Sequence, residues 1–286
     1  MNNSFNVAVS NIEQLKVALK YNIIKLYIPF DLFYCGKLNA EHITRIHENT
    51  SIKVYLALPE ILRKKDDIYL EKLKEYLLSG KADGVLIKNV DELGFILSLK
   101  EGLEKQYISL NGTNDDYTPL YIDSDSSLYT WNINALNFIK QYFKSTTAPL
   151  ELSVHELVEL KDRSVIISIY GHAPLMKSAN CIRKTSGNCG KDTFNHEYSL
   201  IDRKNINTPV LCNCIHCFNI CYNSFPTSLH KQFNDLCAKG FYDFRLDFTL
   251  EDASLVTSIL DYYINRQNND FPLDKYTCGH IQKGAI

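Results

Sequence analysis

The chain has 286 residues, of which 45% are hydrophobic and 22% are charged, and these values are typical of a globular protein rather than a disordered one. Its 31 Lys and Arg residues nearly balance 33 Asp and Glu residues, and the formal net charge of −2 argues against a strong, non-specific nucleic-acid binder. The first residues are polar rather than signal-like and no apolar run approaches the ~18 residues of a membrane helix, so we expect a cytoplasmic protein with no membrane or DNA partner.

Short apolar runs alternate with segments of helical period along most of the chain. Strand-like runs are predicted at residues 5–9, 24–28, 52–58, 84–88, 107–110, 120–122, 128–131, 150–153, 165–170 and 242–248. Helices are predicted at residues 12–20, 40–47, 66–78, 91–100, 134–143, 155–162, 228–239 and 251–265. Asn11 precedes the first helical segment and is a residue type that caps helices.

This alternation predicts parallel strands covered by helices. About eight strand–helix units fit into the chain, which is the number in a TIM barrel. We therefore predict a single α/β domain over residues 1–286, folded as a TIM-like (βα) barrel. A doubly wound open sheet is the alternative, because a sequence pattern does not reveal whether the sheet closes.

The alternation of strand-like and helical segments is interrupted from about residue 171 to residue 223. This segment is composed of small and polar residues and is rich in cysteine. Two strand-like runs, at residues 197–201 and 208–211, lie within this insertion. It follows a late strand, residues 165–170. In a barrel, a segment inserted after a strand lies on the carboxyl-end face, where active sites occur, so the position favours a functional role.

Six of the nine cysteines lie in this insertion: Cys181, Cys189, Cys212, Cys214, Cys217 and Cys221. In a cytoplasmic protein they are expected to be thiols or ligands rather than disulfides, and four thiolates suffice for zinc or an iron–sulfur cluster. If residues 215–222 are extended, Cys217 and Cys221 share a face. The predicted metal site combines Cys181, Cys189 and Cys217 with Cys212, Cys214 or Cys221 as the fourth ligand. The alternative is that the cysteines are small buried hydrophobes.

Two histidines and two arginines are further candidates for chemistry. His172 and His216 flank the cysteines and are expected to be metal ligands, acid–base groups or ordinary surface residues. Arg203 and Arg245 suit an anionic substrate group, or an ion pair with the neighbouring aspartates. Four acidic residues are expected in solvated first turns of helices and are assigned no chemistry: Asp91, Glu92, Glu251 and Asp252.

Several ordered motifs carry a family resemblance. They are Tyr170-Gly-His-Ala-Pro-Leu-Met-Lys-Ser-Ala-Asn-Cys181, Cys189, Tyr198-Ser-Leu-Ile-Asp-Arg-Lys204, and Cys217 before Asn223-Ser224. Flanking them are Leu56-Ala-Leu-Pro-Glu-Ile61, Gly84-Val-Leu-Ile-Lys-Asn89, Phe244-Arg-Leu-Asp-Phe-Thr249 and the ending Tyr276-Thr-Cys-Gly-His-Ile-Gln-Lys-Gly284. Together they resemble peptidase family U32, the collagenase-like peptidases, and most closely the carboxyl-terminal barrel of its long tandem members. The resemblance covers nearly the whole chain.

The resemblance implies a barrel-type fold and, as in several branches of the family, an oxygen-sensitive [4Fe-4S] cluster on four cysteines. Those branches hydroxylate RNA bases or take part in quinone-ring hydroxylation, whereas others carry a peptidase label. Cys181, Cys189 and Cys217 match three of the family cysteines, but residues 190–195 lack the remaining one. Two other positions depart from the family: residues 165–169 are uncharged, and Cys278 replaces a basic residue.

Three functions follow as expectations. The first is RNA base hydroxylation with a Cys-ligated iron–sulfur centre (zinc being the alternative metal), by this chain alone or as a subunit beside a companion U32-family protein. The second is proteolysis, with a pair such as the Cys181 thiolate and the His172 base. The third is a non-catalytic, metal-bearing accessory domain.

Overall fold

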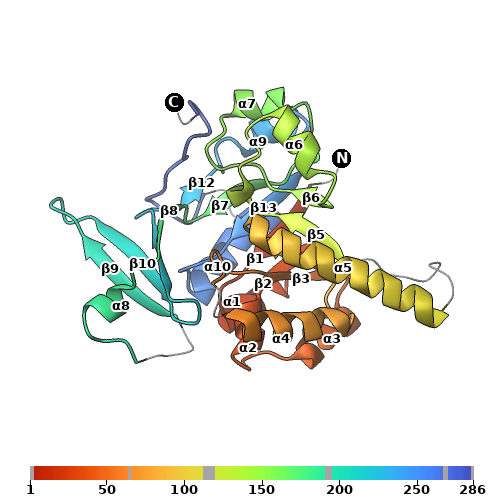
Figure 1. Cartoon of the computed structure of the whole chain (residues 1–286). Helices are drawn as coiled ribbons and strands as arrows, with labels where there is room; N and C mark the ends of the chain where they lie inside the picture. Colours follow the sequence, from red (N-terminus) through yellow and green to blue (C-terminus); the bar gives the residue numbers. More distant parts are fainter. Residues whose placement is uncertain (1–2, 64–65, 112–119, 191–194, 267–269, 285–286) are drawn as a thin grey trace.

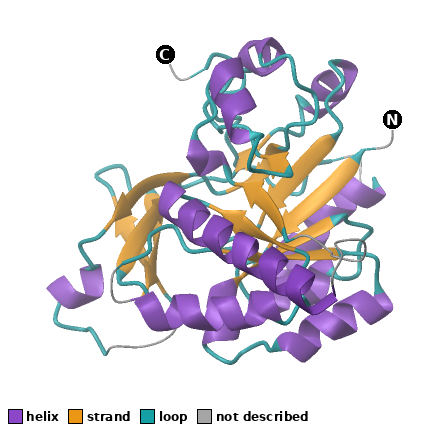
Figure 2. Cartoon of the chain, turned by 45° about the vertical axis from the view of Figure 1, so that its right-hand side comes forward, coloured by secondary structure: helices purple, strands orange, loops and turns teal. Residues whose placement is uncertain are grey.

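The computed structural model describes residues 3–63, 66–111, 120–190, 195–266 and 270–284. It is a mixed α/β fold built on a curled nine-stranded sheet, with helices packed on the outer side of the curl and a smaller antiparallel sheet projecting from it as an arm (Figures 1 and 2). Within the described ranges, no helix is both long enough and apolar enough to cross a membrane.

The large sheet has the strand order β12-β7-β13-β1-β2-β3-β4-β5-β6 and forms a half-barrel. Its strands are parallel to their neighbours, except that β12 runs antiparallel to β7. The bounds are β1 Ser4–Ala8, β2 Lys25–Pro29, β3 Lys53–Ala57, β4 Gly84–Ile87, β5 Tyr121–Ser124, β6 Ser145–Thr146, β7 Ile167–Gly171, β12 Thr227–Ser228 and β13 Asp243–Asp247.

The far edges of this sheet approach each other. Thr147, after β6, forms an isolated parallel bridge with Ile166, before β7. The N–H of Ala148 donates to the carbonyl of Ile166 at 2.9 Å, and the N–H of Ile166 donates to the carbonyl of Thr146 at 2.9 Å. The curl therefore brings β6 back beside β7.

Helices connect successive strands. They are α1 Ile12–Ala18, α2 Phe30–Tyr34, α3 Ala40–Asn49, α4 Asp67–Leu78, α5 Val90–Asn111, α6 Ile133–Ile139, α7 Val154–Glu159, α8 Ile182–Thr185, α9 Phe233–Ala238 and α10 Ala253–Leu260, with a 3-10 turn at Ser126–Leu128 and a π-turn at Asp261–Asn265. As predicted, the Asn11 side chain caps α1 by accepting the N–H of Gln14. Capping boxes begin α3 at Asn39 and α7 at Ser153, which satisfy backbone donors that the helix leaves unpaired.

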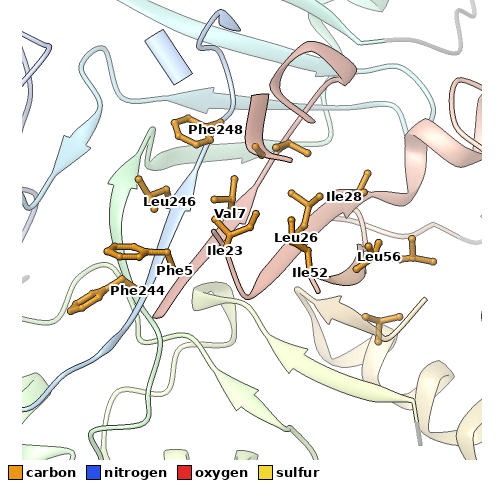
Figure 3. Close-up of a cluster of buried hydrophobic side chains, with 14 of the residues drawn as sticks. Phe5, Val7, Ile23, Leu26, Ile28, Ile52, Leu56, Phe244, Leu246 and Phe248 are labelled. Atoms are coloured by element: carbon orange, nitrogen blue, oxygen red, sulfur yellow. The ribbon is translucent and has the colours of Figure 1, made fainter. Parts of the chain in front are cut away.

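Strand residues alternate between two environments, as the two-residue period of a strand requires. The outward set, including Val7, Leu26 and Leu246, packs beneath the helices in one large apolar core (Figure 3). The inward set forms a separate small cluster around Tyr27 and Tyr55. The inner wall of the curl is therefore aromatic and polar, whereas the apolar core that stabilises the fold lies outside it.

The arm is the antiparallel sheet β8-β11-β10-β9, inserted between β7 and β12. Its strands are β8 Pro174–Ser178, β9 His196–Ile201, β10 Asn207–Asn213 and β11 Phe218–Tyr222. The predicted strand-like runs at residues 197–201 and 208–211 lie in β9 and β10. One face of β11 packs Phe218 and Ile220 into a third apolar cluster with Ile61 of the half-barrel.

Several predicted elements were wrong. Residues 107–110 belong to helix α5, residue 128 ends the 3-10 segment and residues 129–131 have no regular structure, and residues 150–153 lead into α7. The strand closest to residues 150–153 is the two-residue β6, which precedes them and whose Ser145 and Thr146 do not form an apolar run. Residues 227–228 form β12, so the helix predicted from residue 228 begins only at Phe233. Short apolar runs do not distinguish strands from helices, which explains the first error.

Gly84→Ala is expected to lower the free energy of unfolding by about 1–3 kcal/mol. A Cβ at Gly84 would lie 2.5 Å from the Tyr121 carbonyl oxygen and 2.5 Å from a Tyr55 ring carbon, so the inner wall would have to shift. Urea denaturation measures the change. Gly94→Ala in α5 is the control: nothing lies within 4 Å of its Cβ, and helix propensity predicts a gain of about 1 kcal/mol. Equal losses in both variants would contradict the prediction.

Candidate functional site

A cavity of about 780 Å³ lies at the carboxyl ends of the parallel strands. Its walls include residues at or just after the ends of β2, β4, β5 and β13, namely Pro29, Lys88, Asp125 and Asp247. The root of the arm contributes Lys177 and Tyr222. We call this space the mouth cavity. Its position is the one at which parallel α/β folds bind ligands.

Arg245, predicted as a candidate, lies buried in one wall of the mouth cavity. Its guanidinium is 2.6 Å from Asp125 and 2.8 Å from Asp247, and it donates to the Thr147 hydroxyl at 3.1 Å. Burial opposes the charge, but the Asp247 and Asp125 carboxylates outweigh it and raise the pKa of Arg245. The predicted ion pair between Arg245 and Asp247 is therefore present, and Asp125 is a second carboxylate paired with the same guanidinium.

A second charged group joins the half-barrel to the arm. The Glu60 carboxylate accepts a hydrogen bond from Lys88 at 2.8 Å and is also ion-paired with Lys177 of β8. Burial alone would raise the pKa of Glu60, but Lys88 and Lys177 lower it. Both lysine side chains line the mouth cavity and are partly exposed. This wall therefore presents positive charge to anything bound there.

His172 also lines the mouth cavity. Its Nδ1 is 3.0 Å from the carbonyl oxygen of Asn223, and its Nε2 is 3.8 Å from Glu251. Glu251 and Glu92 are buried, so the prediction of solvated first turns was wrong for both. Each accepts backbone N–H groups at the start of a helix, Glu251 from Thr249 at 2.7 Å and Glu92 from Lys88 at 2.7 Å. The buried Glu251 carboxylate therefore lies beside the His172 ring, within ion-pairing distance but too far for a hydrogen bond.

The three cysteines predicted as ligands line one cavity of about 420 Å³ on the arm. Cys181 precedes α8, Cys189 follows α8, and Cys217 ends the turn between β10 and β11. Arg63 of the half-barrel and Lys184 of α8 line the same space. We call it the thiol cavity. Three cysteines that are separated in the sequence therefore line one cavity, together with two cationic side chains.

The three candidates for a fourth ligand, Cys212, Cys214 and Cys221, are not among the residues that line this cavity. Cys212 and Cys221 lie on one face of the β10–β11 pair, because Cys212 is opposite Asn219, which is two residues before Cys221. Burial, followed by the charges of Cys181 and Cys214, raises the pKa of Cys212 to about 11. Residues 214–217 form a turn, so Cys217 does not continue β11 as the extended pattern predicted. Within the described residues, no three His, Cys, Asp or Glu side chains are grouped closely enough to hold one ion.

His216 is fully buried, so the surface alternative is wrong. Its Nε2 is 3.2 Å from Asp31, its Nδ1 is 3.2 Å from Asp66, and its ring packs edge-on against Tyr69 at a centroid distance of 4.5 Å. Burial alone would lower the pKa of His216, but the two carboxylates raise it. His216 therefore anchors the arm to α2 and α4, and its raised pKa favours the charged form of the ring.

The remaining candidates lie apart from these sites. Arg203 is exposed in the turn between β9 and β10. Cys181 and His172, the pair considered for proteolysis, line different cavities. Sequence reasoning missed the roles of Asp125, Glu60 and Lys177. Asp125 follows one predicted strand, and Glu60 lies two residues beyond another. Residues just after parallel strands lie at the carboxyl-end face, so these sequence positions could have indicated both side chains.

No family model matches this chain, and no curated protein matches it.

Proposed function

We propose that this chain is a U32-like enzyme or enzyme subunit, with a metal centre in the thiol cavity and a polar substrate site in the mouth cavity. The chemistry implied by the resemblance is RNA base hydroxylation with a [4Fe-4S] cluster. The observation that carries the proposal is the convergence of Cys181, Cys189 and Cys217 on one cavity. The bridge between Thr147 and Ile166 supports the further proposal that the curled sheet closes as a TIM-like barrel.

The residues around the thiol cavity fit a metal centre by donor type. Thiolates ligate both iron–sulfur clusters and zinc, and Cys212, Cys214 and Cys221 are the nearby sources of a fourth ligand. Arg63 and Lys184 offset the negative charge of thiolates at this cavity. A cluster bound there would supply one-electron transfer.

The chain's own residues give the mouth cavity its binding chemistry. Lys88 and Lys177 present ammonium donors, while Asp125 and Asp247 present acceptors held in place by Arg245. Tyr222 adds an aromatic wall at the arm. Fixed donors and acceptors beside aromatic rings suit a polar, planar substrate group such as a nucleobase.

Anaerobic purification followed by iron, sulfide and zinc analysis tests the metal centre. We expect metal in the wild-type chain and its loss in the combined Cys181→Ser, Cys189→Ser and Cys217→Ser variant. Cys237→Ser, on α9, is the matched control and is expected to retain the metal. Single serine variants at Cys212, Cys214 and Cys221 identify the fourth ligand.

A folded wild-type chain that contains no metal would sink the proposal. Iron with sulfide supports the cluster, whereas zinc alone supports the alternative metal. Incubation of the loaded protein with RNA in cell extract, followed by mass analysis of nucleosides for one added oxygen, tests the reaction. A loaded protein that leaves RNA unmodified, alone and with extract, would favour the accessory role.

A further inference from the structure

Two lysines of the mouth cavity share one carboxylate. Lys88 donates to one oxygen of Glu60 at 2.8 Å, and Lys177 is ion-paired with the other oxygen. Burial opposes the charge of Lys88, but Glu60 and Asp125 raise its pKa. Asp125 is itself bound to Arg245 at 2.6 Å. With Lys88, Lys177 and Glu60 all ionised, one positive charge of this group is therefore left without a counter-ion.

Both lysines are held in place by contacts of their backbone. The N–H of Lys88 donates to the Glu92 carboxylate at 2.7 Å, and its carbonyl accepts from the Ser127 hydroxyl at 2.8 Å. Lys177 lies in β8, which pairs with β11. Two ammonium groups have more N–H donors than the single carboxylate of Glu60 can accept. The spare donors and the spare charge suit an oxyanion with two or more oxygens, such as a phosphate.

An aromatic ring lies at the same cavity. Tyr129 lines the mouth cavity, and 54% of the residue is exposed. Its φ is +51°, a left-handed conformation that costs a residue with a side chain about 1–3 kcal/mol and that is found mainly at functional sites. Its N–H donates to the Ser126 carbonyl at 3.1 Å, and the adjoining Ser127 hydroxyl bonds to Lys88. One turn therefore carries the exposed ring and fixes the backbone of Lys88.

We propose that the mouth cavity binds a nucleotide, with its phosphate at Lys88 and Lys177 and its base stacked on the Tyr129 ring. The inference rests on the part of the proposed function that makes this cavity the substrate site, and it does not depend on the metal centre. Ammonium groups form charge-assisted bonds to phosphate, and any base can stack on an aromatic ring. A cavity of about 780 Å³ is within the size range of pockets that enclose small organic ligands. A free nucleotide and a nucleotide within RNA share this chemistry.

Calorimetric titration of the full chain, freed of metal with a chelator and kept at low salt, tests the inference. The probes are inorganic phosphate, each ribonucleoside 5′-monophosphate, and a single-stranded oligoribonucleotide. In Lys177→Gln, we expect the dissociation constant of every probe to rise about tenfold. In Tyr129→Ala, it should rise about tenfold for the nucleotides and stay unchanged for inorganic phosphate. Tighter binding of the oligoribonucleotide than of the monophosphates assigns the site to RNA, and the reverse assigns it to free nucleotides.

Glu60→Gln distinguishes an anion site from a purely structural ion pair. It removes the negative charge that competes with the ligand, so the dissociation constant of inorganic phosphate is expected to fall severalfold. Lys204→Gln, in the exposed β9–β10 turn of the same arm, is the matched control for Lys177→Gln. Tyr129→Phe keeps the ring and should bind nucleotides as the wild-type chain does. Urea denaturation shows whether each variant is folded.

Three results would overturn the inference: a wild-type chain that binds no probe, a folded Lys177→Gln with the affinities of Lys204→Gln, and a folded Glu60→Gln that binds phosphate no more tightly than the wild-type chain. The metal analysis gives a separate result. A chain that contains metal but binds no nucleotide contradicts the nucleotide site alone. A chain that binds nucleotides but contains no metal supports the nucleotide site and contradicts the metal centre.

Discussion

Arg245→Ala is expected to lower the free energy of unfolding by about 3–5 kcal/mol, because removing one partner of a buried ion pair leaves the other charge buried and uncompensated. Arg245 is buried, and its guanidinium is 2.6 Å from Asp125 and 2.8 Å from Asp247. Both carboxylates would lose their counter-ion. Chemical denaturation with urea measures the loss.

Arg203→Ala provides the matched control. It removes the same side chain from the exposed turn between β9 and β10, where a substitution is expected to change stability by no more than about 0.5 kcal/mol. Lowering the pH should narrow the difference in unfolding free energy between the two variants. Burial would raise the pKa of Asp125, but Arg245 and Lys88 lower it to about 2, so the stability gained from this pair is expected to fall as the pH drops from ~4, the ordinary carboxyl value, through about 2. A similar loss in both variants at neutral pH would refute the role assigned to Arg245.

His216→Ala is expected to destabilise the protein by about 3 kcal/mol and to loosen the arm. The His216 ring lies between Asp31 and Asp66, each 3.2 Å from a ring nitrogen, and it fills space beside Tyr69. Asp31 retains hydrogen bonds from Tyr69 and Asn213, which places the expected loss at the lower end for a buried pair. Hydrogen exchange of β10 and β11 should accelerate more than that of β1 and β2, because the lost anchor joins the arm to the half-barrel.

His155→Ala is the corresponding control, since His155 on α7 is exposed and its ring lies 3.7 Å from Glu159 one turn away. We expect it to leave both stability and exchange near the wild-type values. Uniform acceleration across all strands in His216→Ala would mean that the residue supports the whole fold rather than the docking of the arm.

Local pattern was sufficient for most of the framework. Apolar runs with a two-residue period located β1 to β5, β7 and β13, and helical spacing with Asn11 as a cap located α1. The concentration of cysteines located the arm. These features depend on neighbours within a few residues, so they can be recognised in the sequence. The prediction missed β6 because a two-residue strand of Ser and Thr has no period to detect.

The charges could not be assigned in the same way. Arg245 and Asp125 are 120 residues apart, and His216 and Asp31 are 185 residues apart. Their pairing depends on where distant strands end once the sheet curls. The sequence predicted Asp247 as an ion-pair partner of Arg245 but not the second partner, Asp125. It also did not predict whether His216 is buried or exposed.

By itself, then, the amino-acid order determined an alternating α/β chain, a cysteine-rich insertion after a late strand and the cap of α1 at Asn11, because each arises from contacts between near neighbours. Only the tertiary structure decided that Cys181, Cys189 and Cys217 line one cavity, that Arg63 reaches the carbonyl of Cys217, and that His216 beside Asp31 ties the arm to the half-barrel. Most of those contacts join segments that are far apart in the sequence, and their geometry exists only after the sheet has curled and the arm has docked.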